Sequence, residues 1–242
     1  MYLKRKADAY LNAWKSDPNR SPLIIKGPRQ VGKTETIDYF AAHNYRSVVE
    51  INFVEEPKYR AITADGYGAD TIVRNISLID PAKKFIPGDT LIFFDEIQAH
   101  PDIVTALKFF KIDGKYDVIC SGSMLGISYK QIESNSVGYK TDYEMRSLDF
   151  EEFLWARGYD EAVIESMFTH LCDATPFSEV EMNVFSTAFM DYCVLGGMPA
   201  VVASHIRTGT FEGTLQLQRQ LILDYQELSL IHISEPTRLR CI

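Results

Sequence analysis

Two kinds of apolar segment are missing from this sequence. No uninterrupted apolar run approaches the roughly 18–20 residues that a membrane-spanning helix needs. The basic N-terminus, Met-Tyr-Leu-Lys-Arg-Lys, is not followed by the apolar stretch of a secretory signal. We therefore expect a soluble, cytoplasmic protein with no membrane partner.

Cysteine is scarce. The chain has 4 cysteines among 242 residues, at Cys120, Cys172, Cys193 and Cys241, and they are scattered without metal-ligand spacing. This usage agrees with a reducing compartment and gives no sign of a metal held by thiolates. The first three lie among apolar residues, so we expect them to be reduced and buried.

An excess of basic charge is also absent. Lys and Arg total 25 against 33 Asp and Glu, which gives a net charge of −8. Duplex binding requires a basic face, so the charge does not support nucleic acid as a partner of the chain as a whole. The small cluster from Lys4 to Lys6 is predicted to be solvated charge on a first helix.

Short runs rich in apolar, β-branched and aromatic residues predict buried strands. The runs are Leu23–Ile25, Val48–Phe53, Thr90–Phe94 and Tyr116–Cys120. Helical patterns lie between them, among others from Thr34 to Asn44 and from Ile103 to Phe110. Strands that alternate with helices predict an α/β fold, a parallel sheet with helices on both faces.

The segment between the first predicted strand and the next helix fits the P-loop (Walker A) pattern G-x-x-x-x-G-K-[ST]. Its residues are Gly27, Pro28, Arg29, Gln30, Val31, Gly32, Lys33 and Thr34. The glycines let backbone N–H groups and the helix N-terminus point at phosphate oxygens. Lys33 is predicted to contact the β- and γ-phosphates, and the Thr34 hydroxyl to ligate Mg²⁺. The alternative is a lysine at an ordinary helix start after a glycine turn, and the full motif between a predicted strand and a predicted helix favours the P-loop over it.

The third predicted strand ends in two carboxylates, Asp95 and Glu96, after five strand residues from Thr90 to Phe94. This is the Walker B position of a P-loop ATPase of the additional-strand, catalytic-glutamate class. Asp95 is predicted to serve Mg²⁺, and Glu96 to be the base that polarises the attacking water. A solvated acidic turn is the alternative. The chain contains no Asn-Lys-x-Asp motif, which recognises guanine, so the sequence argues against a Ras-like GTPase.

The fourth predicted strand runs into Ser121-Gly122-Ser123. We expect this strand between the first and the third, so that its polar end faces the γ-phosphate. Ser121 and Ser123 are both candidates for the residue that senses the phosphate, and a plain tight turn is the alternative. Gln98 could contact the nucleotide or cap the turn after the carboxylates, and we favour the turn cap.

Beyond Tyr143 helix signals follow one another without strands between them. Asp149 with Glu152 and Ser178 with Glu181 have the spacing of capping boxes. A stripe with helical spacing is predicted to pack in a core: Val180, Val184, Ala188, Tyr192 and Leu195. We predict a P-loop ATPase domain over residues 1–150 and an incomplete helical or winged-helix-like extension over 151–227.

The tail from Leu228 to Ile242 is predicted not to belong to the natural protein. Leu228 to Arg238 resembles, residue for residue, the translation of a transposon-end adapter used in sequencing libraries. We therefore expect residues 228–242 to be an artefact of the gene sequence and the natural chain to continue past Glu227. An independently cloned gene that encodes the same tail would contradict this.

Five motifs in order resemble the prokaryotic AAA-type ATPases of the AAA_14/DUF4143 family. They are Gly-Pro-Arg-Gln-Val-Gly-Lys-Thr, Leu-Ile-Phe-Phe-Asp-Glu-Ile-Gln, Ser-Gly-Ser, Ser-Leu-Asp-Phe-Glu-Glu-Phe-Leu and Gly-Gly-Met-Pro-Ala, within residues 1–227. The resemblance implies an ATP-binding domain, a winged-helix-like segment and a second domain that this chain lacks. The family's Ala-Gly-Arg-like triplet is replaced by Val137-Gly138-Tyr139-Lys140, so the arginine is missing from that place. Arg146 and Lys140 are candidates to supply the positive charge in the transition state, and the alternative is that both are surface residues.

Two functions follow from these motifs. The first is an Mg²⁺-dependent ATPase that uses ATP to move its C-terminal domains. The second is a slow, nucleotide-gated switch or interaction module that acts with a partner protein or a second copy of the chain. DNA association through the missing C-terminal domain rests on family analogy alone.

Overall fold

The computed structural model describes residues 1–123, 136 and 138–233, with side chains to residue 226. The chain divides into two compact units, Tyr2–Ser147 and Leu148–Ile242, the second of which includes Met1. In the described part of the chain, none of the helices combines the length and apolarity needed to cross a bilayer.

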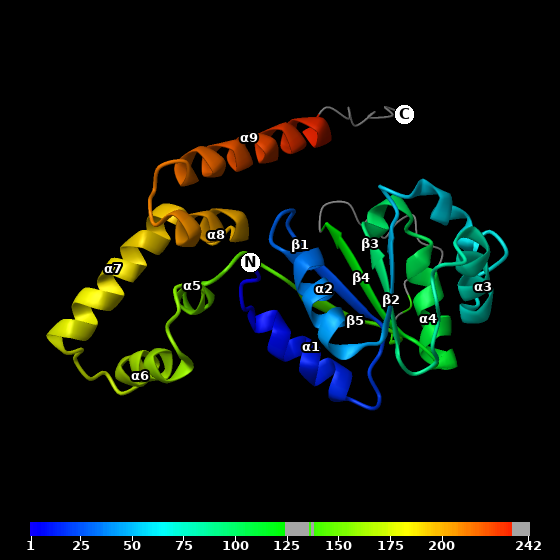
Figure 1. Ribbon diagram of the computed structural model, residues 1–242, viewed down its shortest axis with the longest axis horizontal. Coiled ribbons are helices and arrows are strands. Elements are labelled where there is room, and N and C mark those ends of the chain that lie inside the picture. Colours follow the sequence, from blue (N-terminus) through cyan, green and yellow to red (C-terminus); the bar gives the residue numbers. More distant parts are fainter. Residues whose placement is uncertain (124–135, 137, 234–242) are drawn as a thin grey trace, which may run out of the picture. The chain divides into compact units, whose positions relative to one another are not determined.

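The first unit is built on a five-stranded parallel sheet with the strand order β2-β3-β4-β1-β5 (Figure 1). The strands are β1 (Leu23–Gly27), β2 (Ser47–Asn52), β3 (Thr90–Asp95), β4 (Asp117–Ser123) and β5 (Thr141–Glu144). The four predicted strands are present, and β4 lies between β1 and β3 as expected. The class of fold is therefore confirmed as the α/β, P-loop NTPase-like one.

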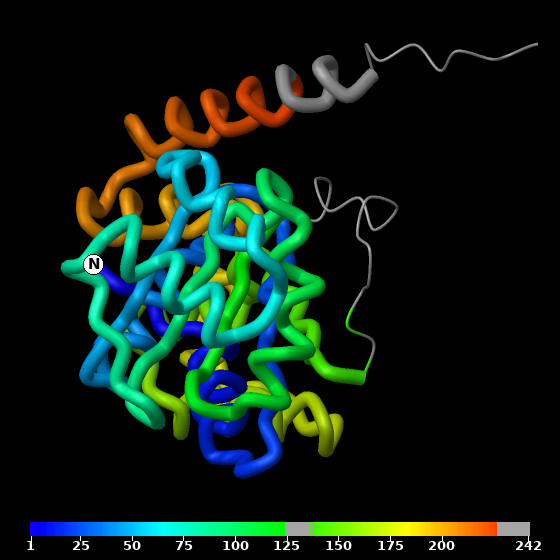
Figure 2. Tube along the Cα trace, turned by 90° about the vertical axis from the view of Figure 1, so that its right-hand side faces the viewer, coloured from blue at the N-terminus to red at the C-terminus, as the bar shows by residue number. Residues whose placement is uncertain are grey.

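Helices cover both faces of this sheet: β3 is buried at every position, and its alternate residues face opposite sides of the sheet. Ile92 and Phe94 pack with α3 (Ala69–Ile79) and α4 (Ile103–Asp113), which lie side by side in Figure 1 and Figure 2. Leu91 and Phe93 pack on the opposite face with α1 (Lys6–Ser16) and α2 (Lys33–Asn44). The short 3-10 helices η1 (Pro57–Thr63) and η2 (Ile97–Ala99) follow β2 and β3.

The described residues of the second unit form helices and no strand. The helices are α5 (Phe150–Ala156), α6 (Glu161–Cys172), α7 (Glu179–Leu195), α8 (Pro199–Thr208) and α9 (Thr214–Ile233). Both predicted capping boxes are confirmed, at the starts of α5 and α7. Of the two predicted alternatives, the described residues fit the helical one. Helix α9 extends into the predicted artefact at Leu228, whereas 234–242 lie outside the described residues.

The Gly-Gly-Met-Pro-Ala motif and the Leu148 region contact each other within the second unit. Gly197 O accepts a hydrogen bond from Leu148 N at 2.7 Å, and Tyr192 Oη donates to Leu148 O at 2.9 Å. A Cβ atom at Gly197 would lie 2.0 Å from Leu148 O, so only glycine allows this approach. Gly196 ends α7 with φ of 68°, and Pro199 begins α8.

Two expectations about burial were confirmed only in part. Cys120 is buried in β4, but Cys172 and Cys193 are exposed because each lies on an outward part of its helix. In α7, Ala188 and Leu195 of the predicted stripe are buried as expected, together with Phe185, whereas Val180 and Val184 are 72% and 36% exposed. In the N-terminal half of α7 the predicted stripe was therefore displaced by one position, because Phe185 packs in place of Val184.

Candidate functional site

The segment Gly27–Thr34 joins the end of β1 to the start of α2. The loop turns sharply because Gln30 and Gly32 have positive φ of 62° and 89°, and Gly32 is the residue before the helix. Gly27 is also sterically required, since a Cβ there would lie 2.1 Å from Met145 O. The strand, glycine loop and helix thus adjoin as the motif requires.

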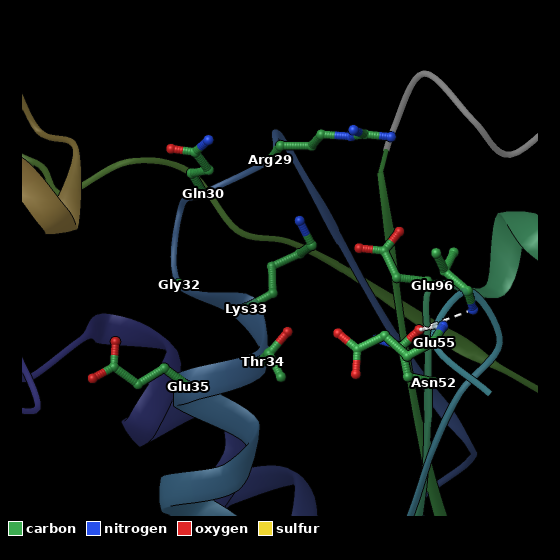
Figure 3. Close-up of a pocket in the computed structure, with 10 residues that line it drawn as sticks. Arg29, Gln30, Gly32, Lys33, Thr34, Glu35, Asn52, Glu55 and Glu96 are labelled. Atoms are coloured by element: carbon green, nitrogen blue, oxygen red, sulfur yellow. Dashed lines mark hydrogen bonds between the residues drawn. The ribbon is translucent and has the colours of Figure 1, made fainter. Parts of the chain in front are cut away.

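Lys33 lies across the mouth of this loop. Its Nζ donates to Gly27 O at 3.1 Å and to Pro28 O at 2.7 Å. Burial lowers the pKa of Lys33, while the nearby carboxylates of Glu96 and Asp95 act in the opposite direction. In Figure 3 the Lys33 side chain and the Glu96 carboxylate extend into the same space.

Asp95 is the centre of a hydrogen-bond cluster formed by four segments of the first unit. It accepts from the Thr34 hydroxyl at 3.2 Å, from the Ser121 hydroxyl, and from the Asn52 amide at 3.4 Å. The backbone N–H of Glu96 also donates to it, at 2.9 Å. The hydroxyl of Thr34 and the carboxylate of Asp95 are oxygen ligands of the kind that Mg²⁺ prefers, so this donor set fits that ion.

Glu96 has a left-handed backbone conformation, with φ of 53° and ψ of 45°. Such a conformation is uncommon for a residue other than glycine and is found more often at functional sites. The Gln98 amide donates to the Glu96 carboxylate, and Gln98 Oε1 accepts from Ser123 N at 3.3 Å. Gln98 therefore joins the carboxylate to the end of β4, a contact that its interpretation as a turn cap missed.

Lys33, Thr34, Asn52 and Glu96 border a cavity of about 400 Å³ (Figure 3). Its lining consists of Arg29, Gln30, Gly32, Lys33, Thr34, Glu35, Asn52, Val54, Glu55 and Glu96. Sequence reasoning missed Glu35, Asn52, Val54 and Glu55. The available signal was the end of β2, because the carboxyl ends of neighbouring parallel strands share one edge of the sheet. There Asn52 Oδ1 accepts from the backbone N–H groups of Val54 and Glu55 at 2.9 and 3.1 Å.

The other predicted site residues do not line the cavity; all are buried except Pro28, which is exposed. Val31 is fully buried in the core between the sheet, α1 and α2. Asp95, Ser121 and Ser123 are buried as well, at 4%, 1% and 8% exposure. The two serines differ in their contacts, since the Ser121 hydroxyl donates to Asp95 whereas the Ser123 backbone donates to Gln98.

Negative charge is concentrated beside the cavity. Partial loss of hydration, and then repulsion by Asp95 and Glu35, raises the pKa of Asp38 in α2, although its side chain is exposed. The same two causes, with Asp38 and Asp95 as the repelling charges, raise the pKa of Glu50 in β2. A cation or a positively charged group near Asp95 would relieve this repulsion.

The two alternatives for an arginine finger form ion pairs with their neighbours. Arg146 pairs with Glu144 at 2.9 Å, and Lys140 pairs with Asp142 at 2.8 Å. Neither residue lines the cavity among the described residues. Val137, the first residue of the substituted triplet, lies outside the described residues.

The five-stranded sheet and the strand-loop-helix segment define the class as an α/β protein with a P-loop NTPase-like fold. A family model described as an AAA domain, AAA_14, matches residues 19–154. The chain belongs to this AAA family and is, at that level, a nucleotide-binding protein of the ATPase type.

Comparison with solved structures finds a likeness to C. elegans PCH-2, at 10% sequence identity and a TM-score of 0.40. The alignment covers 73% of this chain and 50% of that one, so this chain spans about half the length of that protein. No curated protein matches the chain.

Proposed function

We propose that this chain binds ATP with Mg²⁺ in the cavity beside Gly27–Thr34 and hydrolyses it to ADP and phosphate. The observation that carries the proposal is the convergence of Thr34, Ser121 and Asp95 by hydrogen bonds at the carboxyl end of a parallel sheet. Ligands of open α/β sheets bind at this end of the strands. The AAA family assignment supports a nucleotide as the ligand.

Each side chain then has a distinct task. Lys33 exchanges its bonds to the Gly27 and Pro28 carbonyls for bonds to phosphate oxygens. Backbone N–H groups of the loop and of the first turn of α2 donate to the same phosphates. Thr34 and Asp95 would hold Mg²⁺, which supplies neutralising charge on the phosphate oxygens.

Glu96 is proposed as the general base. It accepts a proton from water as the water oxygen bonds to the γ-phosphorus and the bond to the β,γ-bridging oxygen breaks. Its position supports this role, because Glu96 lines the cavity directly after Asp95. Repositioning of the helices over 151–227 is the proposed mechanical result of turnover.

Glu96→Gln tests the catalytic part of the proposal. We expect ATP affinity to be retained and the steady-state rate of phosphate release to fall by about 100-fold or more. Glu56→Gln is the matched control, since Glu56 carries the same charge but does not line the cavity among the described residues. Turnover by Glu96→Gln at the wild-type rate would contradict the role of Glu96, and absence of ATP binding by the wild type would contradict the function.

One observation favours the second candidate, a slow nucleotide-gated switch. The Gln98 amide already occupies a carboxylate oxygen of Glu96, so this oxygen is engaged by a donor other than water. A slow switch predicts that Gln98→Ala hydrolyses ATP faster than the wild type, whereas an unrestrained ATPase predicts an equal or lower rate. If a partner or a second copy is needed, turnover per chain rises with protein concentration.

A further inference from the structure

Arg5 links the phosphate loop to two distant parts of the first unit. It precedes α1 and is only 4% exposed. One guanidinium nitrogen, Nη1, donates to Val31 O at 2.8 Å, and the other, Nη2, donates to Arg146 O at 2.6 Å. Because Arg5 precedes residue 19, it lies outside the segment that the AAA family model matches.

The bond to Val31 O affects which way the next backbone N–H of the loop points. The carbonyl of Val31 and the N–H of Gly32 belong to one peptide group, which is planar and trans, so the two bonds point in opposite directions. A donor that holds the carbonyl on the core side therefore directs the Gly32 N–H to the opposite side. Gly32 lines the cavity, where loop N–H groups are needed for phosphate.

The charge of Arg5 strengthens this arrangement. A hydrogen bond from a cation to the carbonyl polarises the peptide group, which makes the N–H on the other side a better donor. The positive charge, buried directly behind the loop, also adds to the potential that attracts an anion. Both effects act on phosphate although the guanidinium does not touch it.

The second bond of the guanidinium keeps it in place. Arg146 follows β5, and the preceding residue, Met145, donates from its N–H to Lys26 O at 2.7 Å. The end of β5 also packs against the loop, because Met145 O leaves no room for a side chain at Gly27. The Arg5 backbone N–H donates to Asp8 Oδ2 at 2.8 Å, which fixes the start of α1.

We propose that Arg5 is a positioning residue for phosphate binding: through the Val31 carbonyl it orients and polarises the Gly32 N–H toward the phosphates of the nucleotide. The inference rests on the proposed function and adds to it a residue from the N-terminal helix. A lysine at this position retains the charge but has a single donor group, so it cannot bond to both carbonyls with the same geometry.

The test measures ADP binding by isothermal titration calorimetry for the wild type, Arg5→Met and Arg5→Lys. We expect Arg5→Met to weaken ADP binding about tenfold and Arg5→Lys to weaken it less. Leu11→Ala is the control for a merely structural role, since Leu11 is fully buried in α1, the helix that follows Arg5. Leu11→Ala should lower the Tm of the nucleotide-free protein at least as much as the Arg5 substitutions do. Its ADP affinity should stay within about twofold of that of the wild type.

A spectroscopic readout addresses the orientation itself. In ¹H–¹⁵N spectra the Gly32 amide is expected to shift on ADP addition in the wild type, and to shift less in both Arg5 variants. Should Arg5→Met not fold, Arg5→Lys decides by the same two measurements.

ADP affinity within about twofold of the wild type in folded Arg5→Met, or in Arg5→Lys where Arg5→Met does not fold, would overturn the inference, as would an equal loss in Leu11→Ala. These outcomes leave the proposed function standing as long as the wild type binds ADP. If the wild type binds neither ADP nor ATP, the proposed function fails and this inference fails with it.

Discussion

The hydroxyl of Thr34 lies 3.2 Å from the carboxylate of Asp95, although the two residues are 61 positions apart. They meet because α2 begins just beyond β1, and β3 lies two strands away across β4 with the same direction. A parallel sheet places the ends of these elements at one edge. This pairing of a hydroxyl with a carboxylate is the basis of the proposed magnesium site.

The Thr34 hydroxyl is expected to set the magnesium requirement. Thr34→Ala should raise the Mg²⁺ concentration needed for half-maximal ATPase activity about tenfold, because one oxygen ligand is lost. Thr34→Ser keeps the hydroxyl and should restore most of the affinity. Equal magnesium dependence in Thr34→Ala and the wild type would exclude Thr34 as a ligand.

The two serines of β4 should behave differently. Ser121→Ala removes the hydroxyl that donates to Asp95, and we expect kcat to fall about tenfold as Asp95 loses a fixed orientation. Ser123→Ala keeps the backbone N–H that donates to Gln98, so kcat should stay within about threefold of the wild type. The kcat values of the two variants decide which serine acts at the site, and a larger loss in Ser123→Ala would reverse the assignment.

Gly27 is expected to tolerate no side chain. Gly27→Ala would place a methyl group 2.1 Å from Met145 O, a backbone atom that cannot move independently. The variant should lose about 1–3 kcal/mol of unfolding free energy and bind ADP more weakly. Gly68→Ala is the control, since its nearest neighbour would be the Thr71 hydroxyl at 3.5 Å. Denaturant unfolding curves of the two variants compare these costs.

The raised pKa of Asp38 predicts that replacing this carboxyl with a neutral group stabilises the protein by an amount that depends on pH. A carboxyl group with a raised pKa in the folded state binds more protons there than in the unfolded chain. Its contribution to the free energy of unfolding is fully present below the pKa of the unfolded chain, about 4. That contribution is lost as the pH rises through the pKa of the folded protein. Asp38→Asn should therefore raise Tm relative to the wild type more at pH 7 than at pH 3.5, by calorimetry or fluorescence. A difference in Tm that is independent of pH would contradict the raised pKa.

Much of the fold could be predicted because its signals are local. The apolar runs of β1 to β4, the glycines of the loop and the two capping boxes each act within a few residues. Burial in the helical unit was harder to predict. A short stripe such as the one in α7 fits more than one face, and packing partners select among them.

The sequence by itself determined the order of the strands along the chain, the loop from Gly27 to Thr34 and the carboxylate pair that ends β3, because each depends on neighbouring residues. Only the tertiary structure decided which side chains meet there. Asn52 and Gln98 joined the site through the shared edge of parallel strands, and Arg5 reached the loop from α1. Such contacts depend on how separate elements pack, and no spacing along the chain encodes them locally.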